Sequence, residues 1–327
     1  MEISPPTATT DEVSARPSPP PLEELFRQHK HREWHFVQPG GNWGDQLIYA
    51  GAEALAKRLG LTWKNHDFRD FDPSRLQPGA AIYLHGSGGF NPWGSKRAFT
   101  NLKNALTVSD AIVVQGPQTS DVLSELTTNL FAEAFQSART HNVFFYAREK
   151  STLEFVKAKL PTFVSIGLDR DTALHLRQSD ILRLANLDTV PPGRYHLLVS
   201  RDDDEVPNTQ PIAENGAVVM DPGYFARSFE HWIRIHAFAR TIRSNRLHSS
   251  IAGAILGKPV TLMGGSYHKN KSIWEYSLKD LGVLWSDESA ATDSRQPAPK
   301  PNSLSKLLST SWKGKRALLW LKGVPLK

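Results

Sequence analysis

The sequence predicts an α/β protein with two Rossmann-like, doubly wound domains that face each other across a cleft. Three observations predict this class. Short apolar runs alternate with helical stretches, as in βαβ units. Most runs lead into a polar or glycine-rich loop, as buried parallel strands do. The alternation starts again near residue 195, after the hinge-like segment LANLDTVPPGR (184–194), and 327 residues are enough for two compact domains.

The first series of elements defines an N-terminal domain over residues 28–186. The run WHFVQPG is typical of a strand, and the helix expected after it, from about Gln46 to Arg58, is ended by Gly60. Buried strands are expected at 34–40, 80–86, 111–116 and 142–148.

The second series defines a C-terminal domain over residues 187–285, and we expect the donor site in this domain. YHLLVSR (195–201), AVVMDPG (217–223) and PVTLMGG (259–265) are expected strands. A helix is expected near 228–240, followed by TIRSN and a second helix of small apolar residues directly after His248.

The two ends of the chain differ from this body. Residues 1–27 are rich in Pro and Ser and are expected to be disordered, and 286–302 has the composition of a linker. Residues 303–327 can form a basic amphipathic helix with Trp312 and several leucines near one face. We expect this helix to lie on an anionic membrane surface, and packing against the body is the alternative.

Net charge and composition exclude some classes of protein. The whole chain carries +6, and so does 303–327 alone, which holds no acid. The rest is therefore neutral, which argues against a nucleic-acid-binding protein. The sequence contains no cysteine and no run of about 20 apolar residues, and its N-terminus does not resemble a signal peptide. We expect a cytoplasmic protein, associated peripherally with the inner face of the membrane through its tail.

Polar residues gather where the expected strands end, and in an open α/β sheet such positions converge on one crevice. Cationic side chains dominate them, and guanidinium groups bind phosphate or carboxylate bidentately. A cleft of this kind suits a small anionic ligand. The strand-end positions that we assign to it are Asn42, Gly44, Asp45, His85, Gln118, Arg148, Arg246, His248, Lys269 and Lys271.

Several of these positions have a purely structural alternative. Asp45 is a good helix-capping residue, and Arg148 beside Glu149 is compatible with a structural ion pair. HGSGGF resembles a dinucleotide fingerprint only loosely, because the third glycine is missing. RDDDE (201–205) is more typical of a solvated turn than of a metal site, so we expect no metal. Arg246 and His248, two residues apart at the start of an expected helix, are harder to explain structurally, because the N-terminus of a helix is a favourable site for an anion.

Five short motifs, in order, resemble the polysaccharide pyruvyl transferase family. They are GNWGDQLI (41–48), VVQGPQTS (113–120), YAREKSTLEFV (146–156), DRDTALHL (169–176) and RLHSSIAGAILGKPVTLMGGSYHKNKS (246–272). The resemblance extends over about residues 37–283. HGSGGFNPWG departs from the family pattern, which has an apolar strand that leads into G-G-G.

The resemblance implies a fold like that of B-type glycosyltransferases and a reaction. Members transfer the pyruvyl group of phosphoenolpyruvate to two hydroxyls of a sugar, which forms a cyclic ketal and releases phosphate. The resemblance implies that phosphoenolpyruvate is bound by Arg148, Arg246, Lys269 and Lys271, and that His248 supplies the proton.

Asp45 is the implied base or acceptor-orienting carboxylate, and Asn42, Gly44, His85 and Gln118 are expected on the acceptor side of the cleft. The acceptor would be a glycan or lipid-linked sugar of exopolysaccharide or cell-surface glycan biosynthesis. The reaction needs no metal, nucleotide or redox cofactor. Two alternatives remain open, a B-type glycosyltransferase that uses a nucleotide sugar and a non-catalytic protein that binds an anion or glycan.

Overall fold

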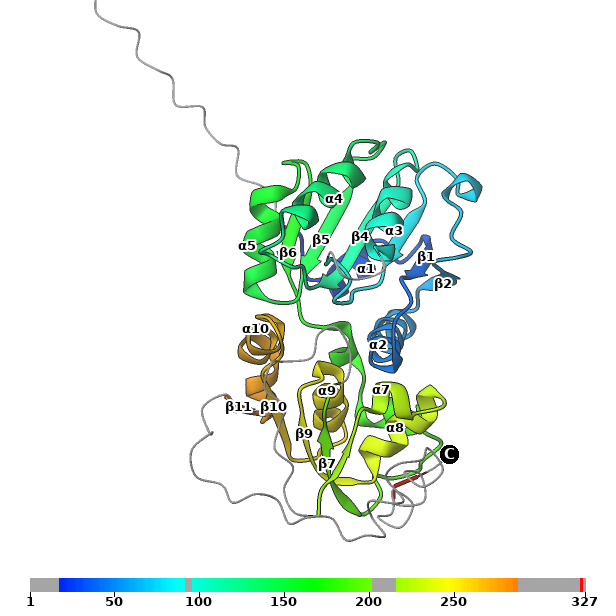
Figure 1. The fold of residues 1–327 in the computed structure, drawn as a ribbon. Helices are drawn as coiled ribbons and strands as arrows, with labels where there is room; N and C mark the ends of the chain where they lie inside the picture. Colours follow the sequence, from blue (N-terminus) through cyan, green and yellow to red (C-terminus); the bar gives the residue numbers. More distant parts are fainter. Residues whose placement is uncertain (1–17, 92–95, 202–215, 288–323, 326–327) are drawn as a thin grey trace, which may run out of the picture.

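A computed structural model describes residues 18–91, 96–201, 216–287 and 324–325 (Figure 1). They form two parallel sheets with helices around them, so the predicted α/β fold class is confirmed. The division into domains at residues 186 and 187 and the likeness to B-type glycosyltransferases stay predictions.

The first sheet has six strands in the order β2-β1-β3-β4-β5-β6, all parallel. Every residue of β3 and β4 is buried, as expected for central strands covered on both faces. The sequence analysis missed β2, because its polar sequence TWKNHD forms an edge strand that pairs with β1 alone. The strands are β1 (Glu33–Gln38), β2 (Thr62–Asp67), β3 (Ala81–Leu84), β4 (Ile112–Gln118), β5 (Val143–Ala147) and β6 (Ser165–Leu168).

The second sheet has five parallel strands in the order β11-β10-β9-β7-β8. Each sheet therefore begins in its middle, runs to one edge, and then reverses direction. The reversal falls between β1 and β3 in the first sheet and between β7 and β9 in the second, and such switch points open a crevice at the carboxyl ends of the strands. The strands are β7 (Tyr195–Val199), β8 (Val218–Met220), β9 (Ala239–Ser244), β10 (Val260–Met263) and β11 (Leu284–Ser286).

The helices follow the strands in βαβ order. The α-helices are α1 (Leu22–Gln28), α2 (Trp43–Leu59), α3 (Arg97–Leu106), α4 (Glu125–Phe135), α5 (Lys150–Lys159), α6 (Gln178–Leu184), α7 (Pro222–Phe225), α8 (Phe229–Ala237), α9 (Leu247–Ile255) and α10 (Lys269–Ile273). Short 3₁₀ or π turns are η1 (Pro73–Arg75), η2 (Thr172–His175), η3 (Trp274–Leu278) and η4 (Lys279–Leu281). No helix in the described ranges is long and apolar enough to cross a membrane.

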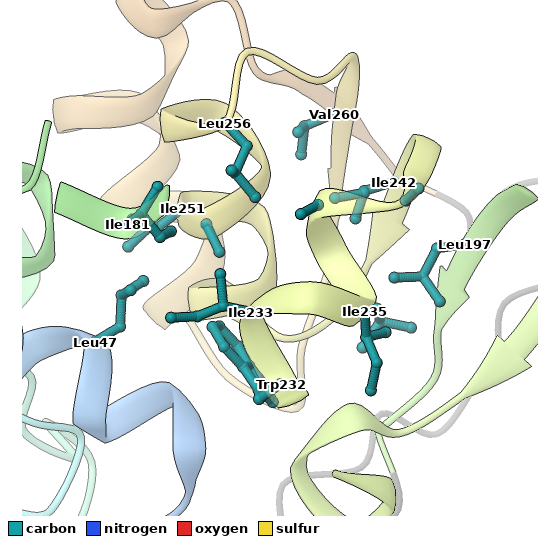
Figure 2. Packing of buried hydrophobic residues seen from close by; sticks show 14 of the residues in the cluster. Leu47, Ile181, Leu197, Trp232, Ile233, Ile235, Ile242, Ile251, Leu256 and Val260 are labelled. Atoms are coloured by element: carbon teal, nitrogen blue, oxygen red, sulfur yellow. The ribbon is translucent and has the colours of Figure 1, made fainter. Parts of the chain in front are cut away.

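Helix α2 connects β1 to β2 and packs on both halves of the chain. Figure 1 shows it between the two sheets, and Leu47 lies in the same apolar cluster as Trp232 and Ile251 (Figure 2). Trp43 Nε1 donates to the Ala226 carbonyl at 3.1 Å. Helix α2 therefore contacts elements beside both switch points.

Residues 22–27 were wrongly assigned to a disordered N-terminus. They form most of α1, in which Leu22, Leu25 and Phe26 are buried. The Leu22 amide donates to Asp169 Oδ2 at 2.7 Å, and the Phe26 ring packs on Trp34. Three apolar side chains in seven residues are enough for a helix that is stabilised by tertiary packing.

The C-terminal segment is described only at Val324 and Pro325. Val324 is buried in the cluster around α8 and α9, and the Pro325 carbonyl lies 2.8 Å from His231 Nε2. The linker was placed one residue too early, because Ser286 ends β11. The rest of the linker from residue 288, the basic helix up to 323 and residues 202–205 of RDDDE lie outside the described residues.

Candidate active site

A cavity of about 210 Å³ lies where the switch points of the two sheets meet. The first sheet contributes the loops after β1 and β3 and Arg148 after β5. The second contributes Arg201 after β7, and Arg246, His248 and Ser249 after β9. The topology thus explains why residues from both halves of the sequence share one cavity.

Arg148 reaches this cavity from a fully buried position. Its Nε donates to Thr119 Oγ1 at 2.8 Å, and its Nη1 donates to Asp171 Oδ2 at 2.6 Å. The third nitrogen, Nη2, is buried without a hydrogen-bond partner among the described residues. It faces Gly88, since a Cβ added there would lie 3.6 Å from Arg148 Nη2 and 3.6 Å from Lys269 Nζ. Arg148 therefore offers one donor to a ligand from a fixed guanidinium.

Asp171 precedes η2 and is also fully buried. Burial opposes its ionisation, but the hydrogen bond with His248 and the charge of Arg148 outweigh burial, so the pKa of Asp171 lies well below its usual range. Its carboxylate therefore stays charged at neutral pH and neutralises part of the charge of Arg148.

Arg246 stands at the start of α9 and is 7 % exposed. Its Nε and Nη2 donate to the two carboxylate oxygens of Asp221, each at 2.6 Å. Ser244 Oγ accepts from the Arg246 amide at 2.9 Å. A bidentate pair of this kind fixes the plane of the guanidinium, so the edge that it presents to the cavity is preorganised.

His248 is the second residue of α9, and its side chain is 14 % exposed. Its Nε2 is 3.4 Å from Asp171 Oδ2. The other ring nitrogen, Nδ1, lies beside Gly44 of α2, where an added Cβ would be only 2.9 Å away. A side chain at position 44 would displace the imidazole, and glycine there lets α2 approach it.

The first turn of α2 forms another wall. Asn42 Oδ1 accepts from the Gly44 amide at 2.7 Å, and Asp45 Oδ2 accepts from the Asn42 amide at 2.9 Å, which is a capping box. The structural alternative for Asp45 is thus confirmed, and its carboxylate also lines the cavity. The N-termini of α2 and α9 both point to this space, which favours an anion.

The cavity is cationic overall. Arg97, Arg148, Arg201, Arg246 and Lys269 line it, while Asp45 is the one carboxylate among the lining residues that the structure describes. Arg97 is held over the Phe68 ring at 4.0 Å. The described residues contain no cluster of three or more His, Asp or Glu that could hold a metal ion.

Sequence comparison decides the family. A model of the polysaccharide pyruvyl transferase family matches residues 42–267, which is more than half of the chain. The chain belongs to the polysaccharide pyruvyl transferase family.

A structural comparison agrees with the two-sheet fold. The chain resembles the crystal structure of a functionally uncharacterised protein from Klebsiella pneumoniae, with a TM-score of 0.61 and 17 % identity. The match covers 81 % of this chain and 96 % of the other. At that identity the likeness shows a shared fold alone. No curated protein sequence matches the chain significantly.

Most of the predicted site residues come together. Asn42, Gly44, Asp45, Arg148, Arg246, His248 and Lys269 all line the cavity. Glu149 is not the partner of Arg148. It caps α5 through the Thr152 amide and lies 3.5 Å from His268 Nε2.

Three predicted residues lie elsewhere. His85 is 2 % exposed and packs on the rings of Phe36, Tyr49 and Tyr83, so it points into the core and not into the cleft. Burial lowers its pKa to about 3, so it is neutral at physiological pH.

The other two are Gln118 and Lys271. Gln118 is fully buried, and its Oε1 accepts a hydrogen bond from the Ser87 amide. It therefore stabilises the loop after β3 and does not line the cavity. Lys271 Nζ lies 4.8 Å and 4.6 Å from the ring centres of Trp274 and Trp285 and is not among the residues that line the cavity. Helical geometry explains this: Lys269 and Lys271 are two apart and point to different sides of α10.

Three functional residues were not predicted from the sequence. Two are Asp171 and Asp221, the carboxylates that hold Arg148 and Arg246, and the third is Arg97. Asp171 lies in the DRDTALHL motif and Asp221 lies within the predicted strand 217–223, so both carried a weak signal. No signal in the sequence indicated that they pair with Arg148 and Arg246, because these pairs are separated by 23 and 25 residues. For Arg97 the sequence offered no signal.

Proposed function

We propose that this chain transfers the pyruvyl group of phosphoenolpyruvate to two hydroxyls of a glycan, which forms a pyruvate ketal and releases phosphate. The observation that carries the proposal is that His248 and two fixed arginines, Arg148 and Arg246, line one cavity. Phosphoenolpyruvate has a carboxylate and a phosphate on three carbons, so it suits cationic groups on opposite walls.

The first step is a proton transfer to carbon. Protonated His248 gives a proton to the methylene carbon of the donor, which becomes a methyl group, and the neighbouring carbon becomes an electrophile that resembles an oxocarbenium ion. Nδ1 is the ring nitrogen assigned to this transfer, because Nε2 faces Asp171. Asp171 Oδ2, 3.4 Å from Nε2, orients the ring for this transfer.

The next steps build the ketal. A sugar hydroxyl attacks the central carbon and loses its proton. A second hydroxyl then displaces phosphate and closes the ring, with the departing charge stabilised by Arg246, Lys269 and the N-terminus of α9. Asp45 is the carboxylate assigned to accept a hydroxyl proton or orient the acceptor, together with Asn42. This scheme uses no metal, nucleotide or redox cofactor.

The acceptor assigned here is a glycan or lipid-linked sugar of exopolysaccharide or cell-surface glycan synthesis. The family match supports a polysaccharide substrate in general. We place the enzyme in the cytoplasm, at the inner face of the membrane, where segment 303–327 with its six basic residues and no acid would contact anionic lipid.

Phosphate release from phosphoenolpyruvate, measured with a panel of glycan acceptors and followed by mass analysis of the product, tests this function. His248→Asn should bind phosphoenolpyruvate but turn over about 100-fold to 10,000-fold more slowly. His196→Asn is a matched control, because His196 is exposed and bonds to Thr241 Oγ1. Stabilisation by nucleotide sugars and not by phosphoenolpyruvate would favour a glycosyltransferase. Tight donor binding without turnover would favour a non-catalytic binding protein.

A further inference from the structure

Asp171 connects the two halves of the cavity without lining it. It lies in the segment between β6 and η2 and is fully buried. One of its donors, Arg148, follows β5 of the first sheet. The other, His248, lies in α9 beside the second sheet. The carboxylate therefore sits where the two groups assigned to the donor substrate come together.

The two oxygens of Asp171 have different partners. Oδ1 accepts from the Ala173 amide at 2.9 Å, which caps η2 and explains the local turn. Oδ2 lies 2.6 Å from Arg148 Nη1 and 3.4 Å from His248 Nε2. The helix cap needs only Oδ1. The contacts of Oδ2 with Arg148 and His248, which come from the two halves of the cavity, therefore require another explanation.

We propose that Asp171 is a positioning residue that orients Arg148 and His248 together for the transfer. Its Oδ2 fixes the Arg148 guanidinium so that Nη2 faces Gly88. The same oxygen accepts the Nε2 proton of His248, which leaves Nδ1 beside Gly44 as the nitrogen that exchanges a proton with the ligand. Which nitrogen of a histidine carries its proton is set by the hydrogen bond of the other one. This inference rests on the proposed function for its catalytic consequence, but not for its geometry.

The geometry is tested in the ligand-free protein. ¹⁵N NMR of the imidazole should show neutral His248 with its proton on Nε2. A neutral His248 with its proton on Nδ1 would overturn the proposal, because Asp171 Oδ2 could not then accept from Nε2. This measurement needs no substrate and no variant, so it decides the question even if Asp171→Asn fails to fold.

The catalytic consequence is tested with a double-mutant cycle at saturating phosphoenolpyruvate. Asp171→Asn keeps the shape of the side chain and removes its charge, and it should lower turnover by about 100-fold. If Asp171 acts through His248, the same change in a His248→Asn background should lower turnover by less than about twofold, because residues that act as a unit are not additive. An equal loss in both backgrounds, or no loss in either, would overturn the proposal.

Asp169→Asn is the matched control. Asp169 lies two residues earlier and is largely buried, and it holds α1 through the Leu22 amide at 2.7 Å. This variant should lower the melting temperature and leave turnover within about twofold, because the Asp169 carboxylate accepts from the Leu22 and Arg170 amides and not from Arg148 or His248. If the wild-type protein releases no phosphate with any acceptor, the proposed function fails, while the NMR result still decides the positioning role.

Discussion

Arg148 and Arg246 are both held by buried carboxylates, but their environments differ. Arg148 is fully buried, and its Nη2 has no hydrogen-bond partner within the described part of the chain. Arg246 is slightly exposed and uses two nitrogens on Asp221. In each case a carboxylate fixes the guanidinium before a ligand arrives, so little side-chain entropy remains to be lost on binding.

We expect Arg148→Ala and Arg246→Ala each to lower the affinity for phosphoenolpyruvate by about 10-fold to 150-fold, the value of a charged hydrogen bond. Lysine at either position should restore only part of the affinity, because it lacks the planar fork. Calorimetric titration without acceptor measures this. Arg75→Ala, at an exposed surface position, is the control. Unchanged affinity in both cavity variants would remove these arginines from the donor site.

Arg148→Ala should also lower stability. It leaves the buried Asp171 carboxylate without its arginine, and breaking a buried pair in this way costs about 3–5 kcal/mol. A loss in this range will show in urea unfolding, so affinity must be compared on folded protein.

At the scale of elements, α2 decides how the two sheets meet. Thr172 Oγ1 donates to the Ile48 carbonyl at 3.0 Å, and Gly51 lies directly against the Thr172 carbonyl. A Cβ at position 51 would overlap this backbone, so the absence of a side chain allows α2 and η2 to touch. The contact also carries the segment that holds Asp171.

We therefore expect Gly51→Ala to lower the free energy of unfolding by about 1–3 kcal/mol, the usual cost of overpacking. In a helix without such a contact, the same change would stabilise by about 0.5–1 kcal/mol. The sign of the change in urea unfolding thus tests the contact. A stabilised variant would show that α2 and η2 are not in close contact.

At the scale of the whole molecule, two buried histidines make stability depend on pH. Burial lowers the pKa of His85 to about 3, and it lowers the pKa of His236 to about 4 against the opposing hydrogen bond to the Trp232 carbonyl. The unfolded chain binds these protons near pH 6.5. Stability is therefore fully present above about pH 6.5 and falls as the pH decreases toward these lower values.

Between pH 7 and pH 5, each of these histidines should remove about 2 kcal/mol from the free energy of unfolding. Urea unfolding at the two pH values measures the loss. His85→Leu is expected to show a smaller loss than the wild type by about 2 kcal/mol, because the group that must stay neutral is gone. Equal losses in the two proteins would show that His85 does not take part.

The described end of the C-terminal segment packs on the body, and this contact can be tested separately from the proposed membrane binding. Truncation after Gly323 removes Val324 from the core and the Pro325 carbonyl from His231 Nε2. We expect it to lower the free energy of unfolding by about 1–3 kcal/mol. A melting temperature equal to that of the full chain would show that this end does not pack on α8.

The proposed membrane binding would depend on different residues of the same segment. Changing the basic residues Lys306, Lys313, Lys315, Arg316 and Lys322 to Gln should abolish co-sedimentation with anionic vesicles at low salt, since each cation contributes about 1 kcal/mol. It should leave the melting temperature unchanged. No vesicle binding by the intact chain would contradict the membrane assignment and favour packing on the body.

The sequence by itself determined the α/β class, most strands and helices, and the family. These follow from local signals: apolar periodicity, Asp45 as a helix-capping residue, Gly60 at the end of α2, and short motifs in a fixed order. The polar edge strand β2 and the start of the body at Leu22 were missed, because both depend on partners far along the chain.

Only the tertiary structure decided which strand-end residues enter the cavity. His85 turns into an aromatic core, Lys271 lies on two tryptophans, and Asp171 meets His248 across 77 residues of sequence. The physical reason is that a residue type and its place at a strand end are local properties. The direction of a side chain and the identity of its partner depend on how α2, η2 and α9 pack, and local sequence does not encode that packing.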